Sequence, residues 1–198
     1  MALVVCGGSG LDAEFLSPTC ASVITSDISI GAARRARERA RRHALAITPI
    51  VADVERLPFP DQAMDLVYVH DGLHHLADPA AGLREMTRVA SQAVSINEPA
   101  RAAVTAAAIR LGLARRREDA GNLVARMKPN EIESLLISQG FRIVCAQRYA
   151  MYYRHKPGPI FSLLSSRVCL PVAKAGLQIL NRFAGGLGNK LTVQAVRG

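Results

Sequence analysis

A glycine-rich turn near the start of the chain is the first group of residues whose types and spacing could bind a ligand. The apolar run Leu3–Val5 leads into the turn Cys6–Gly10, and helix-like sequence follows it. Glycine lets the backbone approach a ligand closely, and the free N–H groups at the start of a helix attract an anionic group. The turn therefore predicts that a nucleotide-like cofactor binds near the N-terminus.

Two acidic residues follow later apolar runs at spacings that suit the same ligand. Asp27 ends the run Val23–Asp27, at roughly the distance from the turn at which a carboxylate binds ribose hydroxyls in dinucleotide-binding proteins. Asp53 follows the run Ile47–Val51. The segment Gly8–Ala13 also fits the dinucleotide pattern, so the turn and Asp27 are compatible with both NAD and S-adenosylmethionine.

An ordered series of motifs extends this pattern. After Asp53 the chain contains Leu57–Pro60, Met64–Val69, Leu73–Pro79 and Leu83–Val89. The series resembles the class I S-adenosylmethionine-dependent methyltransferases of the type 11, small-molecule kind, over residues 2–99 and again at 128–143 and 190–196. The resemblance implies an α/β fold: a Rossmann-like, doubly wound, mainly parallel seven-stranded sheet with an antiparallel last strand. It also implies transfer of a methyl group from S-adenosyl-L-methionine to oxygen or carbon of a small-molecule acceptor.

The resemblance assigns the cofactor-binding residues. Asp27 looks like the acid on the cofactor ribose, and Asp53 looks like the acid that accepts the adenine amino hydrogen. The residues expected to bind the cofactor are Cys6, Gly7, Gly8, Gly10, Asp27, Ile28, Asp53, Val54 and His70. Two departures lie near the turn, because the family usually has an acid at the position of Val4 and a glycine at that of Cys6. A small residue at Cys6 still lets the turn form, whereas the lost acid loosens the loop.

The adjacent histidines His74 and His75 are the candidate catalytic residues. Methyl transfer is an in-line attack on a sulfonium methyl, so a base is needed only when the acceptor is a weakly acidic hydroxyl or carbon acid. Histidine suits that task because its pKa lies near neutral pH. Alternatively, one ring caps the helix that starts near Asp78 while the other packs. No metal is expected, since the pair has no carboxylate or Cys partner at ligand spacing.

Two other functions stay open. The chain begins at the expected first strand, whereas family members usually have a few dozen residues before it that cover the cofactor. Either such a segment is absent from this sequence, a partner or the helical insertions cover the site, or binding is weak. One alternative is therefore a degenerate methyltransferase-like scaffold that binds a partner protein. An NAD-dependent oxidoreductase is the other, but no Tyr-x-x-x-Lys pair supports it and it leaves Asp53 unexplained.

The length of 198 residues and the cysteine pattern indicate one enzyme domain in a reducing compartment. The four cysteines are scattered without a Cys-x-x-Cys pair, so a zinc ribbon or a disulfide scaffold is not expected. The N-terminal residues Met1–Cys6 have no basic region and are too short for a signal or a membrane span. We therefore expect residues 1–198 to form one cytoplasmic domain; the sequence does not indicate the oligomeric state.

The net charge of +9 comes mostly from arginine, and the densest run is Arg34–Arg42. Ala33, Ala36 and Ala40 form a small stripe at helical spacing within this run, so we expect a helix whose arginines point into solvent rather than toward an acidic partner. Such a charge would also attract nucleic acid or an anionic membrane. No nucleic-acid partner is expected, because the motifs indicate a small-molecule enzyme.

The strands that position these residues are expected near 2–6, 22–26, 46–51, 64–69 and 93–97, with a closing antiparallel pair at 141–153 and 190–197. Ligands bind beyond the carboxyl ends of such strands, where the turn, Asp27, Asp53 and His70 all fall. A helix is expected at 131–139, capped by Asn130 and ended by Gly140.

Two helical insertions, 101–127 and 157–188, are expected to shape the acceptor pocket. Because both are basic and apolar, the acceptor is expected to be amphipathic or anionic. The second insertion has the pattern of amphipathic helices. We expect it to be a lid on its own domain, and contact with a membrane surface is the alternative.

Overall fold

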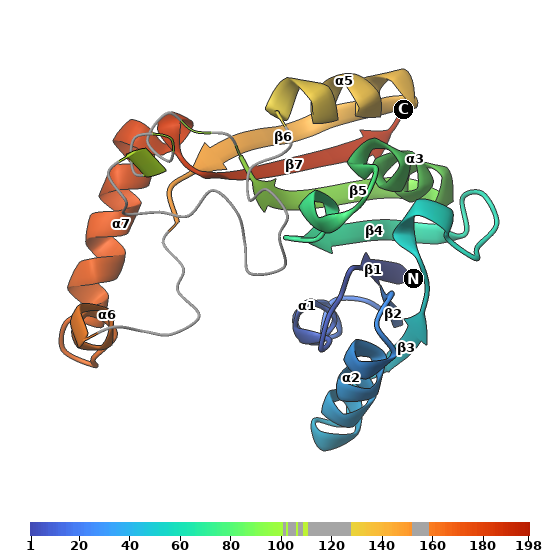
Figure 1. Ribbon diagram of the computed structural model, residues 1–198, viewed down its shortest axis with the longest axis horizontal. Coiled ribbons are helices and arrows are strands. Elements are labelled where there is room, and N and C mark those ends of the chain that lie inside the picture. Colours follow the sequence, from blue (N-terminus) through green and yellow to red (C-terminus); the bar gives the residue numbers. More distant parts are fainter. Residues whose placement is uncertain (101, 103–105, 107–108, 111–127, 152–158) are drawn as a thin grey trace.

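The structure is a computed structural model that describes residues 1–100, 102, 106, 109, 110, 128–151 and 159–198. Seven strands of this part of the chain form one sheet in the order β3-β2-β1-β4-β5-β7-β6 (Figure 1). The strands are β1 (Ala2–Val5), β2 (Val23–Asp27), β3 (Ile47–Val51), β4 (Met64–His70), β5 (Ala90–Pro99), β6 (Phe141–Tyr149) and β7 (Lys190–Arg197). The helices are α1 (Leu11–Leu16), α2 (Ile30–Arg42), α3 (Pro79–Val89), α5 (Pro129–Ser138), α6 (Pro159–Leu164) and α7 (Leu170–Ala184). Short 3-10 turns are η1 (Val54–Arg56), η2 (Leu73–His75) and η3 (Gly185–Leu187).

The strand directions confirm the fold class that the sequence predicts. β1 pairs in parallel with β2 and β4, β2 with β3, and β4 with β5. β7 alone of the described strands runs in the opposite direction, between β5 and β6. The sheet is therefore doubly wound, and the strand order reverses between β1 and β4, the place at which open α/β sheets bind ligands.

The sheet is buried on both faces near its centre, as expected for a parallel sheet. Leu3 and Val5 point into the main core, where Met86 of α3 and Leu136 of α5 pack. Ala2, Val4 and Val23 point to the other face and pack with Ala13 of α1. Because side chains alternate along a strand, the apolar run of β1 serves both layers.

Two helices differ in detail from the sequence prediction. In α2 the buried alanines are Ala32, Ala36 and Ala40, so Ala32 replaces the predicted Ala33 in the inward stripe. Ser29 caps this helix, and its Oγ accepts from the N–H of Ala32 at 3.3 Å. The predicted helix at 131–139 is α5, and Gly140 follows it with a φ of 80°.

The N-terminus of α5 lies two residues before the predicted one. Pro129 occupies the first turn, and the Glu131 carboxylate accepts a hydrogen bond of 3.2 Å from the N–H of Lys128. The cap position is therefore Lys128, and the prediction of Asn130 as the cap is wrong. Proline favours the first helical turn because its missing N–H and fixed φ have no penalty there, which moves the start upstream.

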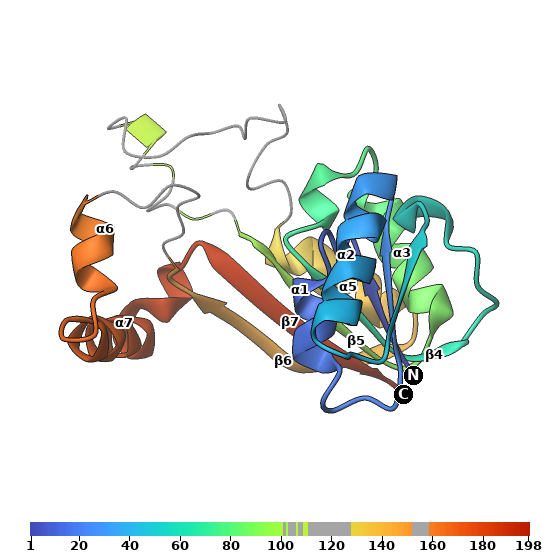
Figure 2. The same ribbon diagram turned by 90° about the horizontal axis from the view of Figure 1, so that it is seen from below.

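The C-terminal helices α6 and α7 fall within the predicted insertion 157–188. Figures 1 and 2 agree that both lie beyond the end of the sheet at which the parallel strands terminate. Within the described ranges, no helix has both the length and the hydropathy that crossing a bilayer requires. The predicted insertion 101–127 lies mostly outside the described residues. The predicted strand 141–153 is too long, because β6 ends at Tyr149 and residues 150 and 151 are not part of it, while 152 and 153 lie outside the described residues.

Candidate functional site

The glycine-rich turn joins β1 to α1 in a tightly folded backbone. Gly7 donates a hydrogen bond of 2.8 Å to the Ser26 carbonyl, and Gly10 donates one of 2.9 Å to the Gly7 carbonyl. A Cβ on Gly7 would lie 2.0 Å from Oγ1 of Thr25, so no larger residue fits there. A Cβ on Gly8, whose φ is 52°, would meet no atom within 4 Å. Gly8 therefore presents bare backbone to open space, which is the geometry that a ligand cradle needs.

Cys6 takes a left-handed backbone conformation in this turn, with a φ of 52°. The conformation disfavours residues that carry a Cβ by about 1–2 kcal/mol. The turn nevertheless forms with cysteine at this position, as the sequence analysis expected. Burial raises the pKa of the Cys6 thiol to about 12, and the nearby charges of Glu98, Asp27 and Asp53 add to the shift. Cys6 is therefore a neutral thiol near physiological pH and not a nucleophile.

Asp27 connects the turn to the end of β2. Its Oδ2 accepts from the N–H of Gly8 and its Oδ1 from the N–H of Ser29, both at 2.9 Å. A carboxylate oxygen can accept two hydrogen bonds, so each oxygen keeps capacity for a ligand hydroxyl. Ile28, the next residue, is 73% exposed, although a large apolar side chain normally packs in the core. Asp27 therefore offers a hydrogen-bond acceptor, and Ile28 offers an exposed apolar surface beside it.

Asp53 lies at the matching end of β3, one strand away from β2. Its Oδ1 accepts from the N–H of Glu55 at 2.9 Å, which starts the short turn η1. The side chain of Asp53 is exposed, whereas that of Val54 is only 4% exposed and belongs to the main core. A ring bound at this place would meet the backbone of Val54 and not its side chain.

His70 ends β4 opposite the glycine turn, because Val69 pairs with Val5. Its Nδ1 lies 3.1 Å from Oδ1 of Asp12 in α1, and its Nε2 lies 3.7 Å from Oδ2 of Asp71. The hydrogen bond with Asp12 raises the pKa of His70, and the charge of Asp71 acts in the same direction. His70 is thus a half-exposed histidine oriented by a carboxylate, at the site where the strand order reverses.

A buried carboxylate fixes the loop that carries the histidine pair. Oε1 of Glu98, at the end of β5, accepts from the N–H groups of Gly72 and Leu73, both at 2.8 Å. Its Oε2 lies 2.7 Å from Nδ1 of His74 and 3.4 Å from the His74 backbone nitrogen. Glu98 and His74 are each 1% exposed. Glu98 therefore holds the turn η2 and the His74 ring in one orientation.

The two adjacent histidines thus have different environments. His75 is exposed, and its ring lies against that of His74 with centroids 4.2 Å apart. Neither caps α3, because Asp78 does so by accepting from the N–H groups of Ala80 and Ala81. The buried His74 ring helps to fix the turn η2 through Glu98, whereas His75 is the member of the pair that faces outward.

Arg39 forms a brace behind the glycine turn that was not predicted from the sequence. Arg39 of α2 turns toward the turn, where its Nε donates to the Ser9 carbonyl at 3.1 Å and its Nη1 binds Glu14 of α1 at 2.5 Å. The expectation that the arginines of Arg34–Arg42 all point into solvent is therefore wrong for Arg39. Only its position in the series distinguishes it: Arg39 lies three residues after Ala36, which packs beneath Gly10.

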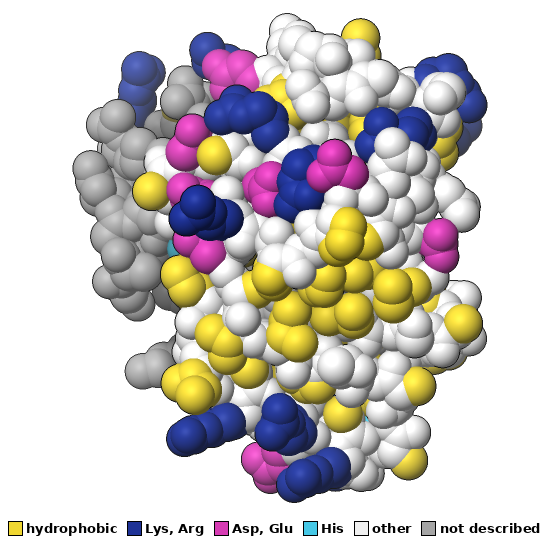
Figure 3. All heavy atoms as spheres, turned by 90° about the vertical axis from the view of Figure 1, so that its right-hand side faces the viewer, with side chains coloured by type: hydrophobic (Ala, Val, Ile, Leu, Met, Phe, Trp, Pro, Cys, Tyr) yellow, Lys and Arg dark blue, Asp and Glu magenta, His cyan; other side chains and the backbone are white. Residues whose placement is uncertain are grey.

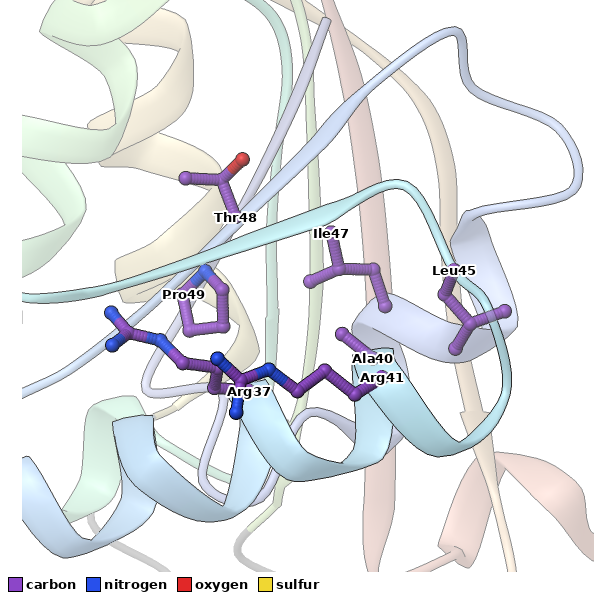
Figure 4. A pocket seen from close by; sticks show the side chains of 7 residues that line it. All are labelled: Arg37, Ala40, Arg41, Leu45, Ile47, Thr48 and Pro49. Carbon is purple, nitrogen blue, oxygen red and sulfur yellow. The ribbon is translucent and has the colours of Figure 1, made fainter.

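Arg37 and Arg41 of α2 border a shallow hollow that is separate from the glycine turn. It has a volume of about 370 Å³ and lies between α2 and the edge strand β3 (Figure 4). Its lining residues are Arg37, Ala40, Arg41, Leu45, Ile47, Thr48 and Pro49. None of the predicted cofactor or catalytic residues is among them.

Comparison with known proteins agrees with this geometry. Residues 3–95 match the family model described as methyltransferase domain. A segment of 92 residues is 38% identical to the ubiquinone/menaquinone biosynthesis C-methyltransferase UbiE of Stenotrophomonas maltophilia, and the match covers 44% of this chain and 36% of that protein. The chain therefore aligns with little more than a third of the length of this curated relative.

Solved structures share the fold of nearly the whole chain. A putative methyltransferase from Bacillus halodurans has a TM-score of 0.70 at 16% identity, over 99% of this chain and 91% of that one. Magnesium protoporphyrin IX methyltransferase from Synechocystis, solved with bound SAH (S-adenosylhomocysteine), has a TM-score of 0.67 at 17% identity, over 100% of this chain and 74% of that one. At these identities the likeness shows the fold.

Proposed function

We propose that this chain, which has the class I methyltransferase fold and whose residues 3–95 match the methyltransferase domain family, is an S-adenosylmethionine-dependent methyltransferase acting on a small-molecule acceptor. The observation that carries the proposal is the link between Gly8 and Asp27. The Asp27 carboxylate at the end of β2 accepts a hydrogen bond from the exposed backbone of the glycine turn, and its oxygens can accept further hydrogen bonds from a ligand.

The residues around the turn fit the cofactor. The open space over Gly8 receives the amino-acid part, and the remaining acceptor sites of Asp27 bind the ribose hydroxyls. The exposed side chain of Ile28 packs on the adenine ring, while Asp53 accepts the adenine amino hydrogen. Cys6, Gly7 and Gly10 shape the turn, Val54 contributes backbone, and His70 borders the methionine part.

The chemistry requires little from the protein beyond position. When bound, S-adenosylmethionine supplies a methyl group on a sulfonium, which an acceptor attacks in line. The chain must therefore hold the acceptor near the end of β4, exclude water, and remove a proton where the acceptor needs it. His75 is the proposed base of the histidine pair because it faces outward, and His74 positions the loop through Glu98.

His70 is a second candidate for the base. Its pairing with Asp12 resembles the carboxylate–histidine arrangement that orients a general base, and its raised pKa is a consequence of that pairing. Alanine at the true base should lower turnover by about 10²–10⁴-fold and leave cofactor affinity nearly unchanged. Measuring both quantities for His70→Ala, His74→Ala and His75→Ala therefore separates a base from a positioning residue.

The acceptor is proposed to be amphipathic or anionic, with methylation at carbon or oxygen. The curated relative is named as a C-methyltransferase of ubiquinone and menaquinone biosynthesis, which supports an apolar acceptor with a polar reacting end. An enzyme that acts on such a molecule would gain access to it by contacting the membrane surface, so we include peripheral membrane contact in the proposal. We further propose a cytoplasmic location, supported by four cysteines that are all free in the structure.

Calorimetric titration with S-adenosylhomocysteine and, separately, with NAD tests the cofactor. We expect saturable binding of S-adenosylhomocysteine and none of NAD. Asp27→Asn should weaken binding roughly 10–100-fold, because a hydrogen bond to a charged group contributes about 1.5–3 kcal/mol. Asp61→Asn is the matched control, since Asp61 is 76% exposed and pairs with Arg88. Saturable NAD binding without a response to S-adenosylhomocysteine would favour an oxidoreductase, and no binding of either would favour the scaffold.

A further inference from the structure

The C-terminal helices expose an unusual amount of apolar surface. We call residues 159–187, which contain α6, α7 and η3, the arm. No residue of α7 is buried. The most exposed large apolar side chains of the arm are Leu163 (63%), Val168 (84%), Val172 (75%), Ile179 (60%), Phe183 (83%) and Leu187 (61%). Contiguous exposed apolar surface on a soluble domain usually marks an interaction site.

The residues of α7 are sorted by face. Val172, Ile179 and Phe183 are spaced by seven and four residues, so they lie along one side of the helix. Lys174, Gln178 and Arg182 recur every four residues and form a polar side. A wide apolar face with basic residues on the opposite face is typical of a helix that lies in the plane of a membrane interface.

The charge of this part of the chain points to an anionic partner. The arm contains three Lys and Arg residues and no Asp or Glu, so its formal charge is +3. On the arm, Arg167, Lys174 and Arg182 are exposed. The opposite end of the molecule, by contrast, shows Asp and Glu side chains beside its Lys and Arg (Figure 3). The interface of an anionic bilayer suits the arm, because it offers acyl chains to the apolar side chains and lipid phosphates to the cations beside them.

The base of the arm is fixed to the sheet. The Asn181 side chain accepts from the Ala150 N–H at 2.6 Å and donates to the Ala150 carbonyl at 3.1 Å. Asn189 makes the same two-point contact with Met151, at 2.9 and 3.0 Å. The first pair holds α7, and the second holds the residue before β7, against the two residues that follow β6. The arm therefore projects in a defined direction, beyond the ends of the parallel strands (Figures 1 and 2).

We propose that the arm docks the protein on the surface of an anionic lipid bilayer. In this arrangement α7 lies in the plane of the interface, with Val172, Ile179 and Phe183 among the acyl chains and with Lys174 and Arg182 near lipid phosphates. The helix does not cross the bilayer: 15 residues rise about 22 Å, against a hydrocarbon core of about 30 Å. The proposal goes beyond methyl transfer and does not depend on it, because docking involves no cofactor.

Sedimentation with vesicles tests the proposal without cofactor or acceptor. We expect the protein to bind vesicles of phosphatidylcholine with 30% phosphatidylglycerol at least about tenfold more tightly than vesicles of phosphatidylcholine alone. Phe183→Ser should reduce binding to the anionic vesicles at least about tenfold. The matched control is Phe15→Ser, because Phe15 of α1 is 79% exposed and lies outside the arm. Lys174→Glu should also weaken binding, whereas Arg34→Glu on α2 should not.

A fluorescence measurement keeps the test valid if Phe183→Ser fails to fold. The chain has no Trp, so Phe183→Trp introduces a single reporter. Its emission should shift to shorter wavelength with anionic vesicles and be quenched by brominated acyl chains, whereas that of Phe15→Trp should not change. Equal binding to neutral and anionic vesicles, no binding to either, or an unchanged emission from Phe183→Trp would each overturn the proposal. So would a dimer in light scattering that Phe183→Ser dissociates, since the apolar face would then be covered by a second copy.

Discussion

Replacing Glu98 by glutamine is the sharpest test of how the histidine loop is held. The carboxylate accepts from the N–H groups of Gly72, Leu73 and His74 and contacts the His74 ring, and it is 1% exposed. Glutamine has the same shape but keeps only one acceptor oxygen. Two of the contacts become neutral hydrogen bonds, and the other two face an NH₂ group.

The expected loss follows from hydrogen-bond energies. Bonds to a charged group contribute about 1.5–3 kcal/mol and neutral ones about 0.5–1.5 kcal/mol. Allowing for a change of the His74 tautomer so that Nδ1 accepts from the new amide, we expect Glu98→Gln to destabilise the protein by about 2–4 kcal/mol. For a chain of this size each kcal/mol shifts Tm by about 2–4 °C, so the melting temperature should fall by roughly 4–16 °C.

Thermal unfolding followed by circular dichroism at pH 7 measures this shift. Glu38→Gln is the matched control, because Glu38 makes an exposed pair with Arg42 and its side chain is 69% exposed. Such pairs contribute at most about 1 kcal/mol. If Glu98→Gln melts at the same temperature as Glu38→Gln, the carboxylate does not hold the turn, and the assignment of His74 as a positioning residue fails with it.

Three further predictions concern the turn and its neighbours. The raised pKa of His70 means that the stabilisation from its pair with Asp12 is fully present below about pH 6.5 and is lost as the pH rises through the folded-state pKa. Asp12→Asn should therefore lower the midpoint of the His70 imidazole titration measured by NMR. An unchanged midpoint contradicts the pairing. Because burial raises the pKa of Cys6 to about 12, iodoacetamide should label this thiol slowly at pH 8 and about tenfold faster per pH unit above that. Mass spectrometry maps the labelled residue, and fast labelling of Cys6 at pH 8 contradicts the burial. Arg39→Gln should weaken S-adenosylhomocysteine binding about 3–10-fold by freeing the Ser9 carbonyl, and Arg42→Gln should not; equal affinities in calorimetry would show that the brace is dispensable.

The expected cofactor residues could be placed from the sequence because they lie at the ends of strands. In a parallel sheet every strand ends at the same edge, so predicting the runs that precede the glycine turn, Asp27, Asp53 and His70 already places these residues together. In the structure, Val5 pairs with Val69 and Asp27 pairs with Val51, so the ends of these strands lie side by side at one edge of the sheet. Element boundaries were less accurate, as at Lys128, because a local cap depends on side-chain contacts that a pattern does not specify.

The roles of single polar side chains depended on contacts between distant parts of the chain. In the sequence only the spacing from Ala36 separates Arg39 from the other arginines of α2, and nothing separates His74 from His75. Folding places Arg39 against Ser9 and Glu14, and it places Glu98 against the loop that contains both histidines.

The class of the fold and the edge of the sheet proposed to bind a ligand could both be predicted from the sequence. Strand periodicity, glycine turns and acids at strand ends are local features, so they can be recognised before the contacts between distant segments are known. Which polar groups are buried, and what they bind, depends on how distant segments come together in the fold. The tertiary structure also showed that the apolar face of α7 is left exposed, because exposure depends on what packs against a helix and not on the helix's own pattern. The amphipathic sequence of the arm is compatible with a lid as well as with a membrane contact, and the exposed apolar face of α7 is what supports the proposed membrane contact.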